Sequence, residues 1–416
     1  MKNIQHISDE MMCSTCGACA AVCPMDAISY EMTSAGRMYA SVNDGCIECG
    51  LCSKVCPSGL ISNKKQGEYN EGHVDGVYVG RSTNDTYYNN AQSGGVCATV
   101  VDYLLSTGMI DAAVMVRMSY GKTPRVEAEV VETTEKLTQF QKSCYSPVPL
   151  LAALKQCKDK KSVAVVGLPC QMTAIMAMQD IKKYANVKYK IGLVCEGVLG
   201  TTAQDVLLSF ADNNMDENRK IDWKKKAVPA TAGGGGYLSA PTVVYDEFGH
   251  EHIMPNSYRF ALKEVFTNPR CKVCNDKLNV NADIVLGDPW GMSGVDWVNG
   301  DSLIITRTAL GKQLFEELLS QNLVTATEHD ISEVISGQHV ETRNKNVEKE
   351  LRTHEYLNRY RQTESLSQKE IIVFARHYIT KQIRKKRITQ SLPYRIYRKI
   401  VTIIVSIQPL FRWCRN

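Results

Sequence analysis

The stretch CSTCGACAAVCP at residues 13–24 is repeated as CIECGLCSKVCP at residues 46–57. Both copies place three cysteines at three-residue spacing and a fourth cysteine directly before a proline. They also share a glycine, Gly17 with Gly50, and a valine, Val22 with Val55. The two stretches are therefore an internal duplication that carries eight thiols.

The spacing of these eight cysteines predicts two iron–sulfur clusters. Three thiolates in such a run can bind three irons of one cubane, and the cysteine before the proline reaches the other cluster. We expect one 4Fe-4S cluster on Cys13, Cys16, Cys19 and Cys56. We expect the second on Cys46, Cys49, Cys52 and Cys23. Zinc sites need only two CxxC pairs, so they do not explain the third cysteine or the Cys-Pro ending. The segment resembles a bacterial two-cluster ferredoxin.

Length and composition agree with a folded protein of several domains. The chain has 416 residues and 16 cysteines, with 44% hydrophobic and 22% charged residues. This composition excludes a wholly disordered or fibrous protein. Residues 1–12 lack the apolar stretch of a secretory signal, and no run of roughly 18 apolar residues could span a membrane. We therefore expect a cytoplasmic protein whose cysteines serve metal or redox chemistry rather than disulfides.

Strand-like and helix-like segments alternate after the cysteine-rich region. Helices are expected at residues 91–106, 171–177 and from about 201, and strands at residues 112–118, 162–166, 188–194, 282–286 and 303–306. This alternation predicts an α/β core. The expected class is α+β, with a ferredoxin-like domain (1–62), two parts of a flavin-binding core (75–160 and 161–335) and a helical, basic tail (340–416).

Four further cysteines share a context within this core. Cys170 and Cys195 each follow a predicted strand, and Cys271 and Cys274 form a CxxC pair a few residues before another strand. Because the carboxyl ends of parallel strands meet at one crevice, these thiols could hold a third cluster. A zinc site, or two buried core cysteines beside an incidental CxxC, would fit the residues as well.

Over about residues 76–307 the chain resembles the family of coenzyme F420 hydrogenase/dehydrogenase beta subunits, and six short motifs carry this resemblance. They are QSGG (92–95), GLPCQ (167–171), IGLVCEG (191–197), RCKVCND (270–276), ADI (282–284) and GDPWG (287–291). The resemblance implies an iron–sulfur flavoprotein that binds FAD and moves electrons between clusters and a hydride-level acceptor. It also implies a third cluster on Cys170, Cys195, Cys271 and Cys274. One departure is Ser143-Cys144-Tyr145, where Ser-Lys-Tyr is expected, so the identity of the substrate stays open.

Two segments are candidates for flavin contacts. Ser93, Gly94 and Gly95 open a predicted helix, where backbone amides could bind the pyrophosphate, although an ordinary helix cap is the alternative. Asp288 could orient a flavin hydroxyl or protonate substrate, and Trp290 could stack on a ring. The alternative for these two is a capped turn and a core indole. No GxGxxG motif follows a strand, so a Rossmann site is not supported. The four glycines at residues 233–236 are expected to form a flexible lid.

The end of the chain is strongly basic. Residues 371–416 contain eleven Lys or Arg and no Asp or Glu. The basic run KQIRKKR (381–387) precedes short apolar stretches, IVTIIVSI (400–407) and LFRW (410–413). This pattern is typical of a helix that lies on an anionic membrane surface. A solvated tail and a helix that docks on a protein partner are the alternatives, and nucleic acid is not expected as a partner.

The sequence therefore predicts an FAD-dependent iron–sulfur oxidoreductase with a small-molecule donor or acceptor. Its redox partner would be a ferredoxin, or a hydrogenase-like or dehydrogenase subunit. It would lie in the cytoplasm, with possible peripheral contact at the inner face of the membrane. The alternative functions are an electron-transfer subunit without its own substrate site, docked on a larger or membrane-associated complex, and a membrane-recruited scaffold whose clusters are structural.

Overall fold

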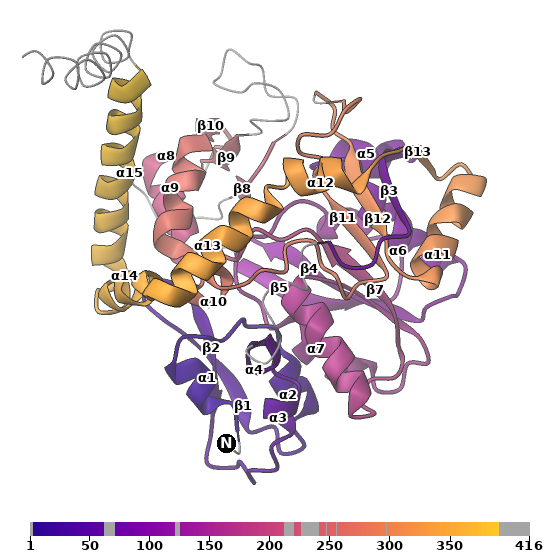
Figure 1. Cartoon of the computed structure of the whole chain (residues 1–416), viewed down its shortest axis with the longest axis horizontal. Helices are drawn as coiled ribbons and strands as arrows, with labels where there is room; N and C mark the ends of the chain where they lie inside the picture. Colours follow the sequence, from indigo (N-terminus) through magenta and orange to yellow (C-terminus); the bar gives the residue numbers. More distant parts are fainter. Residues whose placement is uncertain are drawn as a thin grey trace, which may run out of the picture.

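The computed structural model describes residues 3–61, 71–120, 125–211, 220–225, 241–246, 248–254, 256–296 and 298–390. It is a mixed α and β structure with three regions (Figure 1). In this view a small N-terminal unit forms the lower end of the molecule and a large sheet fills the centre. The last helices of the chain, coloured yellow, stand at the left. The expected glycine-rich lid and the apolar stretches of the tail lie outside the described residues.

The N-terminal unit is ferredoxin-like and reflects the duplication in the sequence. It contains α1 (Gln5–Asp9), α2 (Ala18–Val22), β1 (Ile28–Met32), β2 (Met38–Val42), α3 (Leu51–Lys54) and α4 (Pro57–Ile61). Gly17 and Gly50 directly precede α2 and α3, with φ of 94° and 74°. This left-handed conformation suits glycine, which explains why both copies keep it.

The central sheet has eight strands. Their spatial order is β13 (Val324–Glu328), β3 (Gly76–Ser82), β12 (Ser302–Thr306), β11 (Ile284–Gly287), β7 (Val187–Leu193), β6 (Val163–Gly167), β4 (Ala112–Ser119) and β5 (Arg125–Val131). Strands β11, β7, β6 and β4 are parallel to their neighbours within that group. The α/β core is thereby confirmed, and its predicted strands lie within about two residues of the observed ones. The carboxyl ends of β6 and β7 meet on one edge, as the cysteine argument requires.

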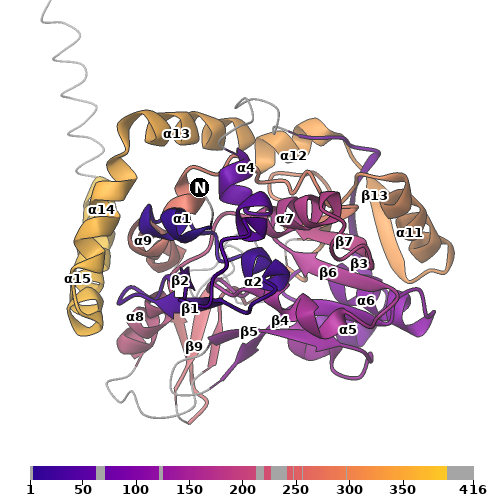
Figure 2. The same cartoon turned by 90° about the horizontal axis from the view of Figure 1, so that it is seen from below.

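Helices cover both faces of this sheet (Figure 2). Along β6, Val163 and Val165 belong to one buried cluster while Ala164 and Val166 belong to the other, because alternate side chains of a strand point to opposite faces. One face packs against α7 (Pro169–Asp180) and the 3₁₀ helix η2 (Leu150–Cys157). The other packs against α5 (Asp85–Asn90), α6 (Val96–Ser106), the 3₁₀ helix η1 (Leu137–Phe140) and α11 (Ala309–Ser320).

One predicted helix begins later than expected. The sequence predicted a helix from residue 91, but α6 begins at Val96 and residues 91–94 form a bend. Gly95 takes a φ of 77°, outside the right-handed helical region, so the helix cannot extend back through it. The SGG motif therefore forms the turn that leads into the helix.

A second, smaller layer lies beside the central sheet. It contains β8 (Lys220–Asp222), β9 (Thr242–Tyr245) and β10 (Glu251–Met254), with α8 (Thr202–Ala211), α9 (Asn256–Phe266) and α10 (Pro269–Lys272). The chain then passes through α12 (Ile331–Gly337), α13 (Val340–Thr353), α14 (Glu355–Glu364) and α15 (Gln368–Gln390).

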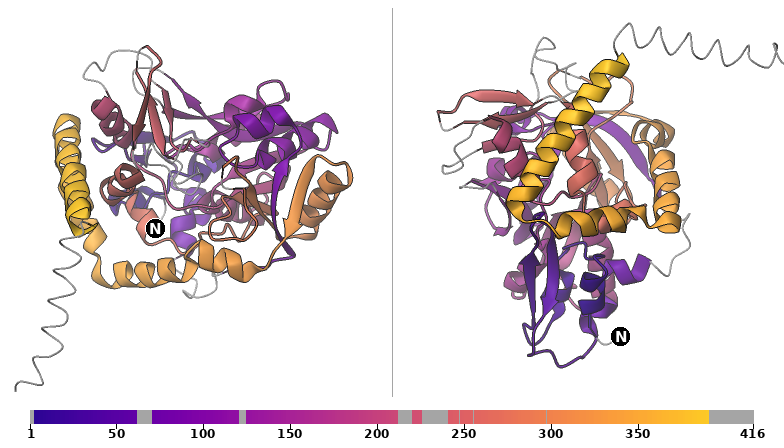
Figure 3. Two further views of the ribbon diagram at one scale, coloured as in Figure 1. Left: turned by 90° about the horizontal axis from the view of Figure 1, so that it is seen from above. Right: turned by 90° about the vertical axis from the view of Figure 1, so that its left-hand side faces the viewer.

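The described part of the expected tail is helical and packs against the body. Ile371, Ala375 and Ile379 of α15 are fully buried in a cluster that includes α8 and α9. Figure 3 shows α15 alongside these helices, with α13 and α14 connecting it to the sheet. The membrane contact expected for the tail stays a prediction. Among the described residues, no helix combines the length and apolar character needed to cross a bilayer.

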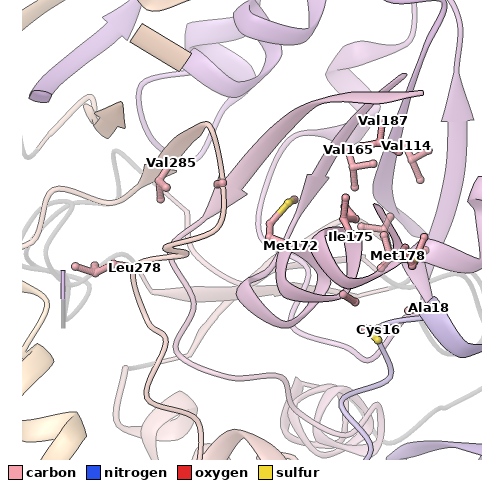
Figure 4. Close-up of a cluster of buried hydrophobic side chains, with 14 of the residues drawn as sticks. Cys16, Ala18, Val114, Val165, Met172, Ile175, Met178, Val187, Leu278 and Val285 are labelled. Carbon is pink, nitrogen blue, oxygen red and sulfur yellow. The ribbon is translucent and has the colours of Figure 1, made fainter. Parts of the chain in front are cut away.

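The ferredoxin-like unit is firmly attached to the core. Leu151 N donates to Cys16 O at 2.9 Å, and Thr201 N donates to Gly36 O at 2.8 Å. Figure 4 shows Cys16 and Ala18 beside Met178 of α7, in the same buried cluster as the sheet residues. The buried Arg37 guanidinium also pairs with Glu364 of α14. These contacts fix the orientation of the unit relative to the sheet.

Candidate functional site

Four cysteines of the ferredoxin-like unit surround one small hollow. Cys13, Cys16, Cys19 and Cys56, which we call the inner quartet, line it together. Burial raises the pKa of the Cys16 thiol to about 12, and negative charge on Cys56 and Cys13 raises it as well. The structure thus brings together the four residues that the sequence assigned to one cluster, although they come from both copies of the duplication.

The other four cysteines of the unit surround a second hollow. Cys23, Cys46, Cys49 and Cys52, the outer quartet, line it with Met25 and Ile47. Again three cysteines come from one copy and the fourth, Cys23, comes from the other. Cys49 is exposed, whereas Cys13, Cys16 and Cys19 of the inner quartet are buried. The two quartets therefore differ in their access to solvent.

The four core cysteines also lie close together. Burial raises the pKa of the Cys170 thiol, and negative charge on Cys16, Cys195, Cys271 and Cys274 raises it further. Cys170 lies at the start of α7, directly after β6, while Cys195 follows β7 and donates its N–H to Lys277 O at 3.0 Å. A Cβ added to Gly197 would lie 3.8 Å from Cys271 Sγ. We call Cys170, Cys195, Cys271 and Cys274 the core quartet.

The geometry of the described side chains does not mark a site for a single metal ion. Within the described parts of the chain, no three His, Cys, Asp or Glu side chains converge on a point that one metal ion could occupy. A cubane is larger, because each of its four irons takes one thiolate. The donor sets, four cysteines around each site, fit that group.

The inner and core quartets are neighbours. Asn268 caps α10, which carries Cys271, and its Nδ2 donates to Cys13 O at 3.1 Å. Cys16 contributes to the electrostatic environment of Cys170. The quartets therefore form a series in which the outer lies at the surface, the inner comes next, and the core quartet lies against the sheet.

A cavity of about 260 Å³ opens beside the core quartet. Cys195 and Gly197 line it, together with residues that follow β6 and β11 and residues that precede α6. Several of the remaining lining side chains are apolar, among them Val96, Leu150 and Leu193. The volume is slightly below the roughly 300–1,000 Å³ typical of ligand pockets, so it matches a ring system better than a whole dinucleotide.

The SGG turn borders this cavity only in part. Ser93 and Gly95 line it, but Gly94 does not. A Cβ added to Gly94 would lie 2.5 Å from Gly80 O and 2.8 Å from Ser302 N. Close packing on β3 and β12 is thus sufficient reason for a glycine, and the approach of a pyrophosphate to Gly94 stays a prediction. The N-termini of α6 and α7 still supply backbone amides at the cavity wall, which is where a phosphate group would be favoured.

Asp288 lies in the cavity wall as part of a buried ion pair. Its carboxylate pairs with the ammonium of Lys224, another lining residue. Burial disfavours the charged form of Lys224, yet Asp288 and Tyr145 hold its pKa above the usual value. Burial likewise opposes ionisation of Tyr145, but Lys224 and Arg259 lower its pKa overall. Trp290 does not line the cavity, and its ring centroid lies 5.5 Å from Lys224 Nζ.

Lys224 and Arg343 were not anticipated from the sequence. Arg343 of α13 donates from Nε to Cys274 O at 2.8 Å and from Nη2 to Cys271 O at 3.4 Å. Burial opposes its charge, but negative charge on Cys274 raises the pKa of Arg343. It lies in a polar helix nearly seventy residues after the CxxC pair, and no local motif marks it. The Ser143-Cys144-Tyr145 segment did carry a signal, and all three residues line the cavity.

Comparison with known families explains this combination of parts. Residues 77–155 and 160–331 match the N-terminal and C-terminal regions described as coenzyme F420 hydrogenase/dehydrogenase, beta subunit. Residues 12–60 match the 4Fe-4S dicluster domain.

Curated relatives are distant. The coenzyme F420-dependent sulfite reductase of Methanocaldococcus jannaschii is 26% identical over 75% of this chain, and the match spans only 46% of that protein. The coenzyme F420 hydrogenase beta subunit of Methanosarcina barkeri is 24% identical, over 58% of this chain and 78% of that protein.

A solved structure shares the fold. A chain of the F420-reducing [NiFe] hydrogenase complex from Methanosarcina barkeri matches with a TM-score of 0.52 and 21% identity, over 67% of this chain and 93% of that one. Together with the two family matches, which span most of residues 77–331, this agrees with the resemblance seen in the sequence. The chain belongs to the family of coenzyme F420 hydrogenase/dehydrogenase beta subunits and carries a 4Fe-4S dicluster domain at residues 12–60.

Proposed function

We propose that this protein is an iron–sulfur flavoprotein oxidoreductase. The inner, outer and core quartets would each hold a 4Fe-4S cluster, and the cavity beside the core quartet would hold the ring system of FAD. When bound, the clusters exchange single electrons and the flavin exchanges either single electrons or a hydride. The substrate is a hydride-level donor or acceptor, either a deazaflavin such as the coenzyme F420 named in the relatives or another reducible small molecule.

One observation carries this proposal: Cys195 belongs to the core quartet and also lines the cavity. A ligand in the cavity would therefore lie next to Cys195, which is also one of the four cysteines proposed to bind the core cluster. The inner quartet adjoins the core quartet, so the quartets offer a route from the surface of the ferredoxin-like unit to the cavity.

The chain's own residues would bind and orient the flavin and substrate. Ser93 and the first turns of α6 and α7 supply hydrogen-bond donors in the cavity wall. Lys224 and Asp288 form a largely buried charge pair in the same wall, where it can orient a polar substrate group. Tyr145 carries a hydroxyl whose pKa is lowered by its cationic neighbours, against the effect of burial. That hydroxyl is the candidate proton donor in the cavity wall.

The proposal is tested by counting cofactors after anaerobic reconstitution. Three cubanes give about twelve iron atoms per chain, and the flavin content should be close to one per chain. Cys271→Ser should reduce the iron count toward eight, whereas Cys157→Ser, at a buried cysteine outside the quartets, should not change it. A count near eight in the unmodified protein, unaffected by Cys271→Ser, would exclude the third cluster. Clusters without any flavin would indicate an electron carrier without a substrate site.

A further inference from the structure

The two quartets of the ferredoxin-like unit face different surroundings. The inner quartet is enclosed within the unit, and its Cys16 belongs to a buried cluster that also contains residues of the core. The outer quartet lines a separate hollow of the unit, and its Cys49 is exposed. The series of quartets therefore has one end at the solvent-exposed outer quartet and the other at the cavity.

Large apolar side chains are exposed beside the outer quartet. Ile47 is 59% exposed and Met25 is 51% exposed. Each lies within two residues of a cysteine of the quartet along the chain, and both line the same hollow as its thiols. Apolar side chains that gather on a surface within a polar rim often mark a contact with another protein. Here they surround the thiols where a cluster would be closest to solvent.

The rim of this surface is acidic. Asp44 and Glu48 are exposed and lie on either side of Cys46 in the sequence. Between residues 3 and 61 the unit has six Asp or Glu and only two Lys or Arg. One of those two, Arg37, is buried against Glu364 and cannot neutralise the surface. Asp26, next to Met25, is already paired with Lys155 of η2. Asp44 and Glu48 therefore carry the negative charge of this rim, and the thiolates that would bind a cluster add to it.

We propose that the outer face, formed by Met25, Asp44, Ile47, Glu48 and Cys49, docks a one-electron carrier that presents an apolar centre within a ring of Lys or Arg. This inference rests on the proposed function, which requires a route for electrons at the surface end. Each encounter transfers one electron between the carrier and this protein, so two encounters, together with one proton released to or taken up from solvent, balance one hydride exchanged in the cavity. The apolar centre brings the two redox centres close, while complementary charge speeds the encounter.

The experiment uses the reconstituted full chain, reduced anaerobically, with cytochrome c as a basic one-electron acceptor. Its reduction is followed by stopped flow at several salt concentrations. The second-order rate constant should fall as salt rises, because screening weakens attraction between exposed charges. The double variant Asp44→Lys/Glu48→Lys should be about tenfold slower at low salt and lose most of the salt dependence. The control variant Glu316→Lys/Glu328→Lys, the same charge change at exposed positions of α11 and β13, should match the unmodified protein.

A second readout does not depend on electron flow. Carbodiimide cross-linking of the oxidised protein to cytochrome c should join Asp44 or Glu48 to lysines of the probe. The milder double variant Asp44→Asn/Glu48→Gln should lose these cross-links, and its iron content should show that the quartets remain intact. Ile47→Ser should slow cytochrome c reduction without changing the slope against salt, since it removes apolar contact and no charge.

Two results would overturn the docking inference. One is an unchanged rate in both double variants, together with cross-links that map elsewhere. The other is faster exchange of the unmodified protein with an acidic acceptor, such as a plant-type ferredoxin, than with cytochrome c at low salt. Failure of the proposed function is separate, because it would appear as missing flavin or a missing core cluster in the same samples. The cross-linking result would stand in either case.

Discussion

Removing the charge of Arg343 should lower the reduction potential of the cluster at the core quartet. The guanidinium is partly buried, and it donates hydrogen bonds to the backbone carbonyls of Cys274 and Cys271. A fixed positive charge favours the reduced cluster, which carries one more negative charge than the oxidised form. Arg343→Gln keeps a long polar side chain but removes that charge.

The size of the effect follows from Coulomb's law. Two unit charges about 7 Å apart interact by roughly 2–3 kcal/mol at an effective dielectric constant near 20. For a one-electron couple, about 59 mV corresponds to a tenfold change in the equilibrium constant, or about 1.4 kcal/mol. Arg343→Gln should therefore shift the midpoint potential by about −100 mV.

The assay is a redox titration followed by electron paramagnetic resonance. The signal that disappears in Cys271→Ser identifies the core cluster, and its midpoint potential is then compared between unmodified protein and Arg343→Gln. Arg352→Gln, at an exposed position on the same helix α13, is the matched control and should leave the potential unchanged. An upward shift in Arg343→Gln, or equal shifts in the ferredoxin-type signals, would refute the assignment of Arg343 to the core quartet.

Three further predictions concern stability and ionisation. Arg37→Ala should cost about 3–5 kcal/mol in denaturant unfolding, because it leaves a largely buried carboxylate unpaired, whereas Arg117→Ala, which breaks more exposed pairs, should cost about 1 kcal/mol or less. Gly94→Ala should cost about 1–3 kcal/mol even without flavin, since its Cβ would overlap β3, while Gly59→Ala, with open space around the added Cβ, should not. Tyr145→Phe should remove a tyrosinate absorbance change that occurs below the ordinary pKa near 10. Ionised Tyr145 should add to the free energy of unfolding above the ordinary pKa near 10. This contribution should be lost as the pH falls through the lowered pKa that Tyr145 has in the folded protein.

The regular parts of the core could be predicted because their signals are local. The β-branched runs at residues 162–166 and 188–194 became β6 and β7 with only small shifts. Their following cysteines met because parallel strands end at one edge. Likewise, three-residue cysteine spacing and Cys-Pro endings sufficed to group the eight N-terminal thiols into the two observed quartets.

Long-range packing set the limits of the prediction. Gly94 was interpreted through its neighbours in sequence, but its close contacts are with Gly80 and Ser302, which no local pattern could reveal. Arg343 reaches the CxxC pair from a distant polar helix. The sequence also placed the first half of α15 in a helical, basic tail expected to contact a membrane surface, although Ile371, Ala375 and Ile379 give it a buried stripe that packs on α8 and α9. That stripe has helical spacing, so the sequence carried a signal that the charge pattern obscured.

The central claim is that the three quartets carry electrons between the surface and the cavity. Measuring electron transfer in the variant Cys170→Ser tests it most directly. The bound flavin is first reduced, and its reoxidation by cytochrome c is then followed anaerobically by stopped flow. The account predicts that Cys170→Ser retains its flavin and its ferredoxin-type clusters but no longer passes electrons to cytochrome c, while Cys157→Ser behaves like the unmodified protein. Flavin reoxidation at the unmodified rate in Cys170→Ser would contradict the claim that the core quartet connects the cavity to the surface.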